Sequence, residues 1–169
     1  MDSQKFLLEN GTAVAIGCFD GLHIGHKEVI QTAVNFAKKY SQKSVVFQIK
    51  RNSDLLLTST ETAEILCSWD VDEVVCRPLD AEFMNLSCDE FVKQYLCDFL
   101  NAKFVSVGYN FRFGKEAIGD VEMLKKLCNR CNIELCITPP VKVDGEIVST
   151  TKLRKMLANG EDVLRYLGR

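Results

Sequence analysis

The sequence predicts an α/β protein with a Rossmann-like, doubly wound parallel sheet of about five strands and helices on both faces. Two observations carry this prediction. Short apolar runs alternate with segments of helical periodicity from the first strand to the last helix. The loops that are richest in glycine, hydroxyl and aromatic residues lie where sheets of this class bind their ligands, beyond the carboxyl ends of the strands.

Each element of the first half has its own local signal. Apolar runs bounded by turn residues indicate strands, and apolar residues at helical spacing indicate helices. Thr58 and Glu61 have the Ser/Thr-x-x-Glu form of a capping box, which marks a helix start. These signals predict, in order, a strand over Thr12–Gly17, a helix to about Tyr40, a strand over Ser44–Ile49, a loop over residues 50–58, a helix through Ser68 and a strand over Glu73–Cys76.

The second half continues the alternation, and Ser87 with Glu90 forms a second capping box. We see no internal repeat or linker, so we expect a single domain over residues 1–169. The predicted elements are a helix to about Leu100, a strand over Lys103–Gly108, a loop over Tyr109–Gly119, a helix from about Asp120 to Asn132, a strand over Ile133–Thr138, turns at Pro139–Pro140 and Asp144–Gly145, and a helical region that starts near Thr150, is interrupted at Asn159–Gly160 and resumes to Leu167.

Composition excludes several classes of protein. The 169 residues are 47% hydrophobic and 26% charged, which is a normal balance for a globular domain with a sizeable core. A formal net charge of -2 argues against nucleic acid as the main partner. No apolar run approaches the roughly 18 to 20 residues that cross a bilayer, and the first residues lack a signal-peptide pattern. We therefore expect a cytoplasmic protein with no membrane partner; its oligomeric state is not predicted.

The eight cysteines are expected to be reduced thiols, since most lie among apolar residues. Cys128 and Cys131 form the only C-x-x-C pair. This pair has no second pair and no nearby histidine, so it lacks the ligands of a four-coordinate zinc site. The favoured interpretation is two ordinary thiols on one helix face, with metal or redox use as the alternative.

The loop from Gly17 to His26 is the strongest candidate site. Its three glycines allow a sharp turn and a close approach of the backbone to a ligand. Gly25 stands where the next helix begins, and a helix N-terminus offers free N–H groups to a phosphate. His23 and His26 are the only histidines of the chain and can donate hydrogen bonds to that phosphate. Capping and packing of the helix is the alternative role for each histidine taken singly.

Two further segments carry candidate residues. Ser149, Thr150 and Arg154 stand at a predicted helix start, where hydroxyls can cap the helix or hydrogen-bond a phosphate and Arg154 can neutralise a polyphosphate. The alternative is an ordinary cap followed by a solvated basic face. In the Gly108–Gly114 segment, Phe111 and Phe113 can flank a planar ring that Asn110 hydrogen-bonds, or they can form a hydrophobic plug over the sheet.

These motifs resemble a known family. The Gly17–His26 string is similar to the G-x-F-D-G-x-H-x-G-H motif of the N-terminal adenylyltransferase module of bacterial FAD synthetases, the bifunctional riboflavin kinase/FMN adenylyltransferases. Gly108–Gly114 resembles that module's G-x-N/D-F-x-F-G stretch, and Val148–Arg154 resembles its S-S-T-x-x-R motif. The histidine motif alone indicates only the wider nucleotidyltransferase superfamily, whereas the three motifs together are far more specific. The resemblance covers nearly the whole chain.

The resemblance implies transfer of the adenylyl group of ATP to FMN, giving FAD and pyrophosphate, with Mg²⁺ bridging the phosphates and no dedicated protein ligands for it. His23, His26 and Arg154 are the implied catalytic residues. The implied binding residues are Gly17, Phe19, Asp20, Gly21 and Gly25 in the ATP loop, Ser149 and Thr150 for the leaving pyrophosphate, and Asn110, Phe111 and Phe113 for the flavin. Asp20 shapes the turn or contacts the ion through water.

Two features depart from the family pattern. The family continues from a Leu-Gly-Arg into a riboflavin kinase domain, whereas this chain stops at Arg169, so we expect no kinase activity. The family also carries a D-P-H-P type loop after its second strand, where this sequence has Lys50-Arg51-Asn52-Ser53. Two alternatives therefore stay open: a related nucleotidyltransferase with another phosphorylated acceptor, and a non-catalytic flavin- or nucleotide-binding protein.

Overall fold

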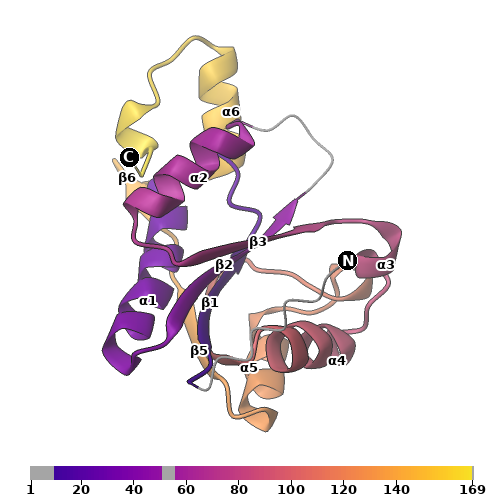
Figure 1. Ribbon diagram of the computed structural model, residues 1–169. Coiled ribbons are helices and arrows are strands. Elements are labelled where there is room, and N and C mark those ends of the chain that lie inside the picture. The colour runs from indigo at the N-terminus through magenta and orange to yellow at the C-terminus, as the bar shows by residue number, and fades with distance from the viewer. Residues whose placement is uncertain (1–9, 51–55, 169) are drawn as a thin grey trace.

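The computed structural model describes residues 10–50 and 56–168. Its main sheet has five parallel strands in the order β3-β2-β1-β4-β5 (Figure 1). The predicted fold class is therefore confirmed. The five strands are β1 (Thr12–Gly17), β2 (Lys43–Lys50), β3 (Glu73–Pro78), β4 (Ala102–Gly108) and β5 (Glu134–Thr138).

The central strand β1 marks the point where the order of the sheet reverses. It pairs with β2 on one side and with β4 on the other, with Ile16 opposite Phe47 and Val107. The next two strands in the chain, β2 and β3, are therefore added on one side of β1, and the last two, β4 and β5, are added on the other side. In open parallel sheets, the loops beyond the carboxyl ends of the strands at such a switch point form the ligand crevice. Here those loops are the ones after β1 and β4.

Helices cover both faces of the sheet, and the alternation of side chains along β1 explains why (Figure 1). Ala13 and Ala15 pack in one core cluster with α1 (Ile24–Tyr40) and α2 (Ser59–Ser68). Val14 and Ile16 pack in a second cluster, whose helices lie on the other face. These helices are α4 (Cys88–Phe91), the π-helix η1 that continues it (Val92–Phe99), and α5 (Val121–Arg130).

Several short elements differ from those expected. The helix after the second capping box ends in π-helical turns, in which the N–H of Leu100 donates to the Tyr95 carbonyl five residues back (2.9 Å). The Asp144–Gly145 turn connects the two strands of a small hairpin. After α6 (Thr150–Ala158), the helical region does not resume as an α-helix but ends in a single 3₁₀ turn. The additional elements are α3 (Ala81–Met84), η2 (Lys115–Ala117), β6 (Lys142–Val143), β7 (Glu146–Ile147), α6 (Thr150–Ala158) and η3 (Leu164–Tyr166).

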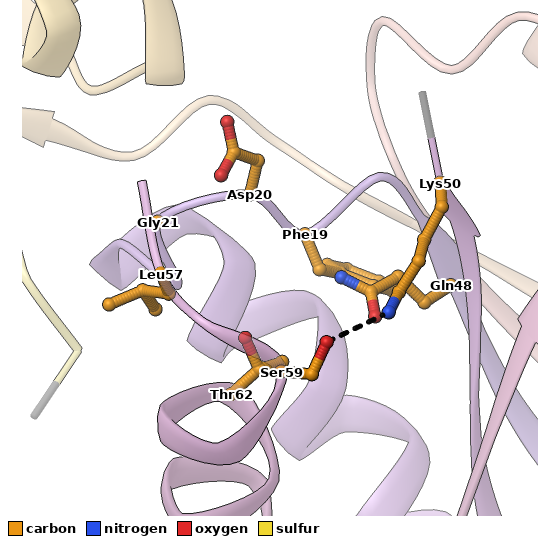
Figure 2. Close-up of a pocket in the computed structure, with 8 residues that line it drawn as sticks. All are labelled: Phe19, Asp20, Gly21, Gln48, Lys50, Leu57, Ser59 and Thr62. Atoms are coloured by element: carbon orange, nitrogen blue, oxygen red, sulfur yellow. Dashed lines mark hydrogen bonds between the residues drawn. The ribbon is translucent and has the colours of Figure 1, made fainter. Parts of the chain in front are cut away.

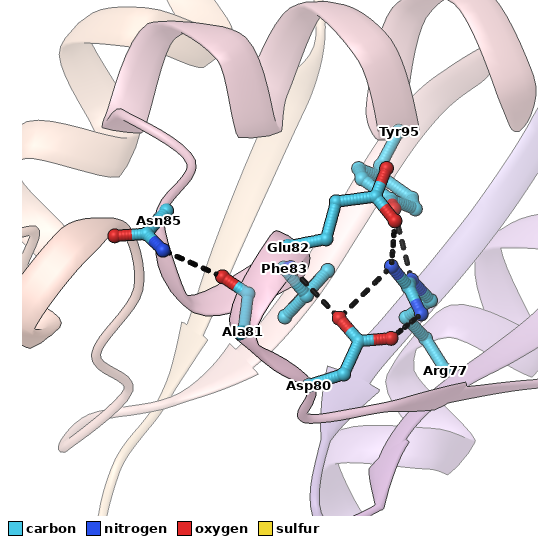
Figure 3. A network of polar contacts seen from close by, with 7 residues as sticks. All are labelled: Arg77, Asp80, Ala81, Glu82, Phe83, Asn85 and Tyr95. Atoms are coloured by element: carbon cyan, nitrogen blue, oxygen red, sulfur yellow. Dashed lines mark hydrogen bonds and ion pairs between the residues drawn. The ribbon is translucent and has the colours of Figure 1, made fainter.

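A polar network around Arg77 fixes α3 at the carboxyl end of β3 (Figure 3). The guanidinium donates to the Tyr95 hydroxyl (2.9 Å) and to the Asp80 carboxylate (2.7 Å). The Tyr95 hydrogen bond is the main reason that the pKa of Arg77 is raised. Asp80 also caps α3 through the Phe83 N–H, and this bond, followed by Arg77, lowers the pKa of its carboxyl. Arg77 is thus used in holding the fold together.

Within the two described ranges, no helix combines the length and the apolar character that crossing a membrane requires. All eight cysteines lie in these ranges, and each is a free thiol. Burial raises the pKa of the Cys128 thiol to about 12, whereas Cys131 is exposed. The part of the chain that the structure describes holds no group of three or more His, Cys, Asp or Glu side chains that could bind a metal ion.

Candidate functional site

The loop after β1 turns sharply through left-handed backbone. Gly21 has φ +80, a left-handed conformation that glycine adopts without strain. A Cβ at this position would lie 2.9 Å from the Cδ1 atom of Leu56, the end of a flexible side chain, so the backbone conformation is the main reason for glycine here. Two residues with side chains, Phe19 (φ 50) and Leu22 (φ 42), also adopt the left-handed region. Such conformations cost about 1–3 kcal/mol each and cluster at functional sites. The loop is therefore held in a specific shape by its surroundings.

The two histidines stack at the start of α1. Their ring centroids are 3.6 Å apart with planes inclined by 19°, and the edge of Phe19 packs against His26 at 5.4 Å. His23 is the N-cap: its Nδ1 accepts a hydrogen bond from the His26 N–H (3.2 Å). A Cβ on Gly25 would lie only 3.2 Å from the His23 ring, so glycine at this position leaves room for the ring to pack where it does. The capping role left open by the sequence is therefore real for His23, and it fixes the orientation of the ring.

Burial keeps both imidazoles neutral. Desolvation lowers the pKa of His23 to about 4, against a smaller opposing effect of its backbone hydrogen bond and of the Asp20 charge. The pKa of His26 is lowered well below its usual value, by burial first and by the neighbouring His23 second. Because Nδ1 of the neutral His23 accepts a hydrogen bond, its proton resides on Nε2, which is left as a donor. The Nδ1 atom of His26 is buried with no hydrogen-bond partner among the described residues.

Asp20 joins the first loop to the start of α6. One carboxylate oxygen accepts from the Leu56 N–H (2.9 Å), and the other pairs with the Arg154 guanidinium (2.6 Å). The Thr150 hydroxyl donates to the Asp20 carbonyl (3.0 Å). The structure thus brings the Gly17–His26 and Ser149–Arg154 segments together, and of the two roles expected for Asp20 it displays the one of shaping the loop.

Ser149 and Lys152 are both engaged locally. Ser149 is the N-cap of α6, and its hydroxyl oxygen accepts from the Lys152 N–H (3.2 Å). The Lys152 ammonium pairs with Glu146 and lies 5.0 Å from the centre of the Tyr166 ring. Of the basic residues in this segment, Arg154 is therefore the one that faces the loop from Gly17 to His26, which we call the histidine loop.

The loop after β4 places its aromatic residues at different depths. Phe113 is buried (5% exposed), packs against Phe91 and pairs with Gly119 through two backbone hydrogen bonds. Phe111 is half-buried and stacks on Phe113 at 5.8 Å, and Asn110 is exposed. Phe113 therefore forms the hydrophobic plug that the sequence allowed, and the outer residues Asn110 and Phe111 are the ones that a ligand can reach.

A hollow beside the histidine loop was not predicted. It lies between the loop and the start of α2, where the Lys50 ammonium donates to the Ser59 hydroxyl (3.3 Å) (Figure 2). The Asp20 carboxylate points away from this pair. The lining residues are Phe19, Asp20, Gly21, Gln48, Lys50, Leu57, Ser59 and Thr62. Lys50 is the last residue of β2, which pairs with β1. Its position at the carboxyl edge of the sheet was the sequence signal that could have predicted a place beside the loop. The other residues of the predicted departure from the family pattern, Arg51, Asn52 and Ser53, lie outside the described residues.

Comparison with known proteins decides the family. The family model for FAD synthetase matches residues 6–152. The chain belongs to the FAD synthetase family. Relatives within it include a bifunctional riboflavin kinase/FMN adenylyltransferase of Buchnera aphidicola subsp. Schizaphis graminum, 29% identical over 96% of this chain and 56% of the relative. The Escherichia coli K12 protein of the same name is 28% identical over 89% of this chain and 51% of that protein.

Another relative carries the family's name, and a solved structure has the same fold. A protein of Listeria monocytogenes named FAD synthetase is 26% identical over 87% of this chain and 63% of its own length. The chain spans about half the length of the first curated relatives it matches. A solved structure described as a macrolide-efflux protein from Streptococcus pneumoniae has a TM-score of 0.76 over 92% of this chain and 54% of that chain. At 24% identity, this likeness supports the fold alone.

Proposed function

We propose that the chain transfers the adenylyl group of ATP to FMN, giving FAD and pyrophosphate. The observation that carries the proposal is the neutral, stacked histidine pair at the N-terminus of α1, closed on one side by the Asp20–Arg154 ion pair. This arrangement offers backbone N–H groups, an imidazole donor and a guanidinium fork to one polyphosphate. Membership of the FAD synthetase family supports FMN as the acceptor.

Adenylyl transfer needs no covalent enzyme intermediate. The FMN phosphate attacks the ATP α-phosphorus in line, and pyrophosphate leaves on the opposite side. His23 donates from Nε2 to a phosphate oxygen. His26 lies in the first turn of α1, where the helix dipole favours negative charge, and donates a second hydrogen bond that stabilises charge at the α-phosphoryl group. Arg154, oriented by Asp20, stabilises the charge that grows on the leaving pyrophosphate. Catalysis thus consists of positioning and charge stabilisation.

The side chains around the loop suit a magnesium ion that arrives with ATP. Both carboxylate oxygens of Asp20 already have partners, and the described ranges offer no cage of acidic residues. Mg²⁺ commonly keeps phosphate oxygens and waters as its main ligands, and when bound it neutralises phosphate charge.

We also propose that the reaction takes place in the cytoplasm, where the free thiols of all eight cysteines would stay reduced.

A panel of acceptors tests the proposal. The protein is incubated with Mg²⁺-ATP and, separately, with FMN, nicotinamide mononucleotide or phosphopantetheine, and the products are identified by mass. We expect FAD with FMN and no nucleotide product with the other two. Turnover with another acceptor alone would replace FMN in the proposal, and binding of ATP and FMN without any product would indicate a non-catalytic binding protein.

A further inference from the structure

The segment that follows η3 lies against the histidine loop. Leu167 pairs with His23 in an isolated antiparallel bridge, and the Gly168 N–H donates to the Leu22 carbonyl (3.0 Å). Leu22 is one of the residues with left-handed backbone, directly before the helix cap. A main-chain contact at this point therefore bears on the part of the loop that sets the position of the His23 ring.

Lys27 and Trp69 hold Gly168 from the other side. The Lys27 ammonium donates to the Gly168 carbonyl (2.8 Å) and lies 5.4 Å from the centre of the Trp69 ring. Trp69 is buried, and its carbonyl accepts a hydrogen bond from the Gln31 side chain of α1 (2.9 Å). A lysine in the first turn of a helix that faces phosphate is an obvious phosphate ligand by charge. Here that cation is directed to a carbonyl and a ring face instead.

Only glycine fits between these partners. A Cβ at Gly168 would lie 2.7 Å from Trp69 Cζ2 and 3.0 Å from the Leu22 carbonyl oxygen. The carbonyl oxygen belongs to the backbone and the ring is packed in the core, so neither can yield cheaply. A side chain at this position must therefore move the loop, the ring or the segment itself.

We propose that Gly168, Lys27 and Trp69 form a latch that positions the histidine loop for adenylyl transfer. The inference rests on the proposed function. The three are positioning residues that act through Leu22 and His23. Because a displacement of about 1 Å at a reacting group can cost on the order of 100-fold in rate, a loosened latch slows transfer without removing any phosphate ligand.

The test compares Gly168→Val, Lys27→Met and Lys27→Arg with the wild-type chain. The readouts are kcat and KM for ATP and FMN, ATP affinity by calorimetry, and the fluorescence of Trp69, the only tryptophan of the chain. We expect Gly168→Val and Lys27→Met to lower kcat/KM for ATP and to weaken ATP binding by about ten-fold or more, with the KM for FMN unchanged. Lys27→Arg keeps the cation and the donor and should stay near wild type. Trp69 emission should shift to longer wavelength in Gly168→Val.

Gly160→Ala is the control for a glycine replacement away from the loop. A Cβ there meets nothing within 4 Å, but Gly160 has φ +73, so the change should lower stability somewhat and leave activity at the wild-type value. If Gly168→Val does not fold, the Lys27 pair decides alone. Wild-type values for kcat/KM and ATP affinity in both Gly168→Val and Lys27→Met would overturn the latch, whatever Trp69 reports. If no variant and no wild-type chain forms FAD, the proposed function fails, and ATP affinity still decides whether the latch shapes the loop.

Discussion

Two histidines at the proposed phosphate site would bind phosphate most strongly as cations, yet burial keeps this pair neutral. The neutral state fixes one tautomer of His23. Its Nδ1 accepts the hydrogen bond that caps α1, so the proton is on Nε2. The stacked rings also keep each other from charging in the free protein, since two cations at 3.6 Å would repel.

Replacing His26 tests the catalytic half of this pair. We expect His26→Ala to lower kcat for FAD formation by roughly 100- to 1000-fold, the range that loss of one preorganised donor produces. The measurement is the rate of FAD formation at saturating Mg²⁺-ATP and FMN, with thermal unfolding recorded in parallel. A folded His26→Ala protein with near-normal turnover would remove His26 from the mechanism.

The buried state of His23 predicts a pH dependence of stability. Its pKa is about 4 in the folded protein and 6.5 in the unfolded chain, so between these values only the unfolded chain takes up the proton. Stability is therefore intact above about pH 6.5 and is lost as the pH falls toward 4. Near pH 4.5 this site should have cost about 2–3 kcal/mol.

Urea unfolding near pH 7 and near pH 4.5 measures this effect against His23→Asn, which keeps a capping side chain but does not titrate. The wild-type protein should lose more stability than His23→Asn on acidification, by that difference. Equal losses in the two proteins would show that folding does not lower the pKa of His23.

At the level of single residues, the sequence predicted which side chains gather but not how they are bonded. The short spacing of His23 and His26 was enough to place both at one helix start. The ion-pair partner of Asp20 could not be predicted from the sequence, because Arg154 is 134 residues away along the chain and the two residues meet only in the folded protein. Phe113 shows the same limit: aromatic composition could not say which ring would be buried.

Between elements, the Asp20–Arg154 pair connects the loop after β1 with α6. We expect a double-mutant cycle over Asp20→Ala and Arg154→Ala to give a coupling energy of about 1 kcal/mol or more in urea unfolding, because Asp20 is only 13% exposed. Asp20→Ala should also raise the KM for ATP, since Arg154 loses its orientation. Additive single effects would mean that the ion pair does not couple the two elements.

The second capping box gives a prediction confined to one helix. Ser87 accepts from the Glu90 N–H (3.2 Å) while Glu90 accepts from the Ser87 N–H (2.8 Å). Ser87→Ala should lower the free energy of unfolding by about 1 kcal/mol. It should leave the KM for ATP unchanged, because α4 packs against the loop after β4, through Phe91 and Phe113, rather than against the proposed ATP site. Chemical denaturation and a KM measurement check both parts, and a large rise in the KM for ATP at unchanged stability would contradict them.

The elements that the sequence predicted best are those with local signals. Both capping boxes start helices as expected, and the five apolar runs are the five strands. The π-helical end of the second capped helix depends on how Tyr95 and its neighbours pack against Phe47, Phe83 and Phe91. The β6–β7 hairpin has only two residues in each strand, too few for a periodic pattern.

At the scale of the whole molecule, sheet order brings two distant motifs, Gly17–His26 and Gly108–Gly114, to one edge of the sheet. β1 lies between β2 and β4, so the loop after β1 adjoins both the Lys50 end of β2 and the loop after β4. The alternation of strands and helices predicted that these loops share one edge. The same alternation could not predict the hollow between the histidine loop and α2. The residues that line the hollow come from separate segments of the chain, which meet only in the folded protein (Figure 2).

The central claim is that this chain is a catalyst of adenylyl transfer and that the histidine loop is its site. The most direct measurement follows FAD and pyrophosphate together in one reaction with Mg²⁺-ATP, excess FMN and a trace amount of protein. We expect both products to appear in equal amounts, over many turnovers per protein molecule. ATP and FMN bound by the protein, with neither product formed, would contradict it.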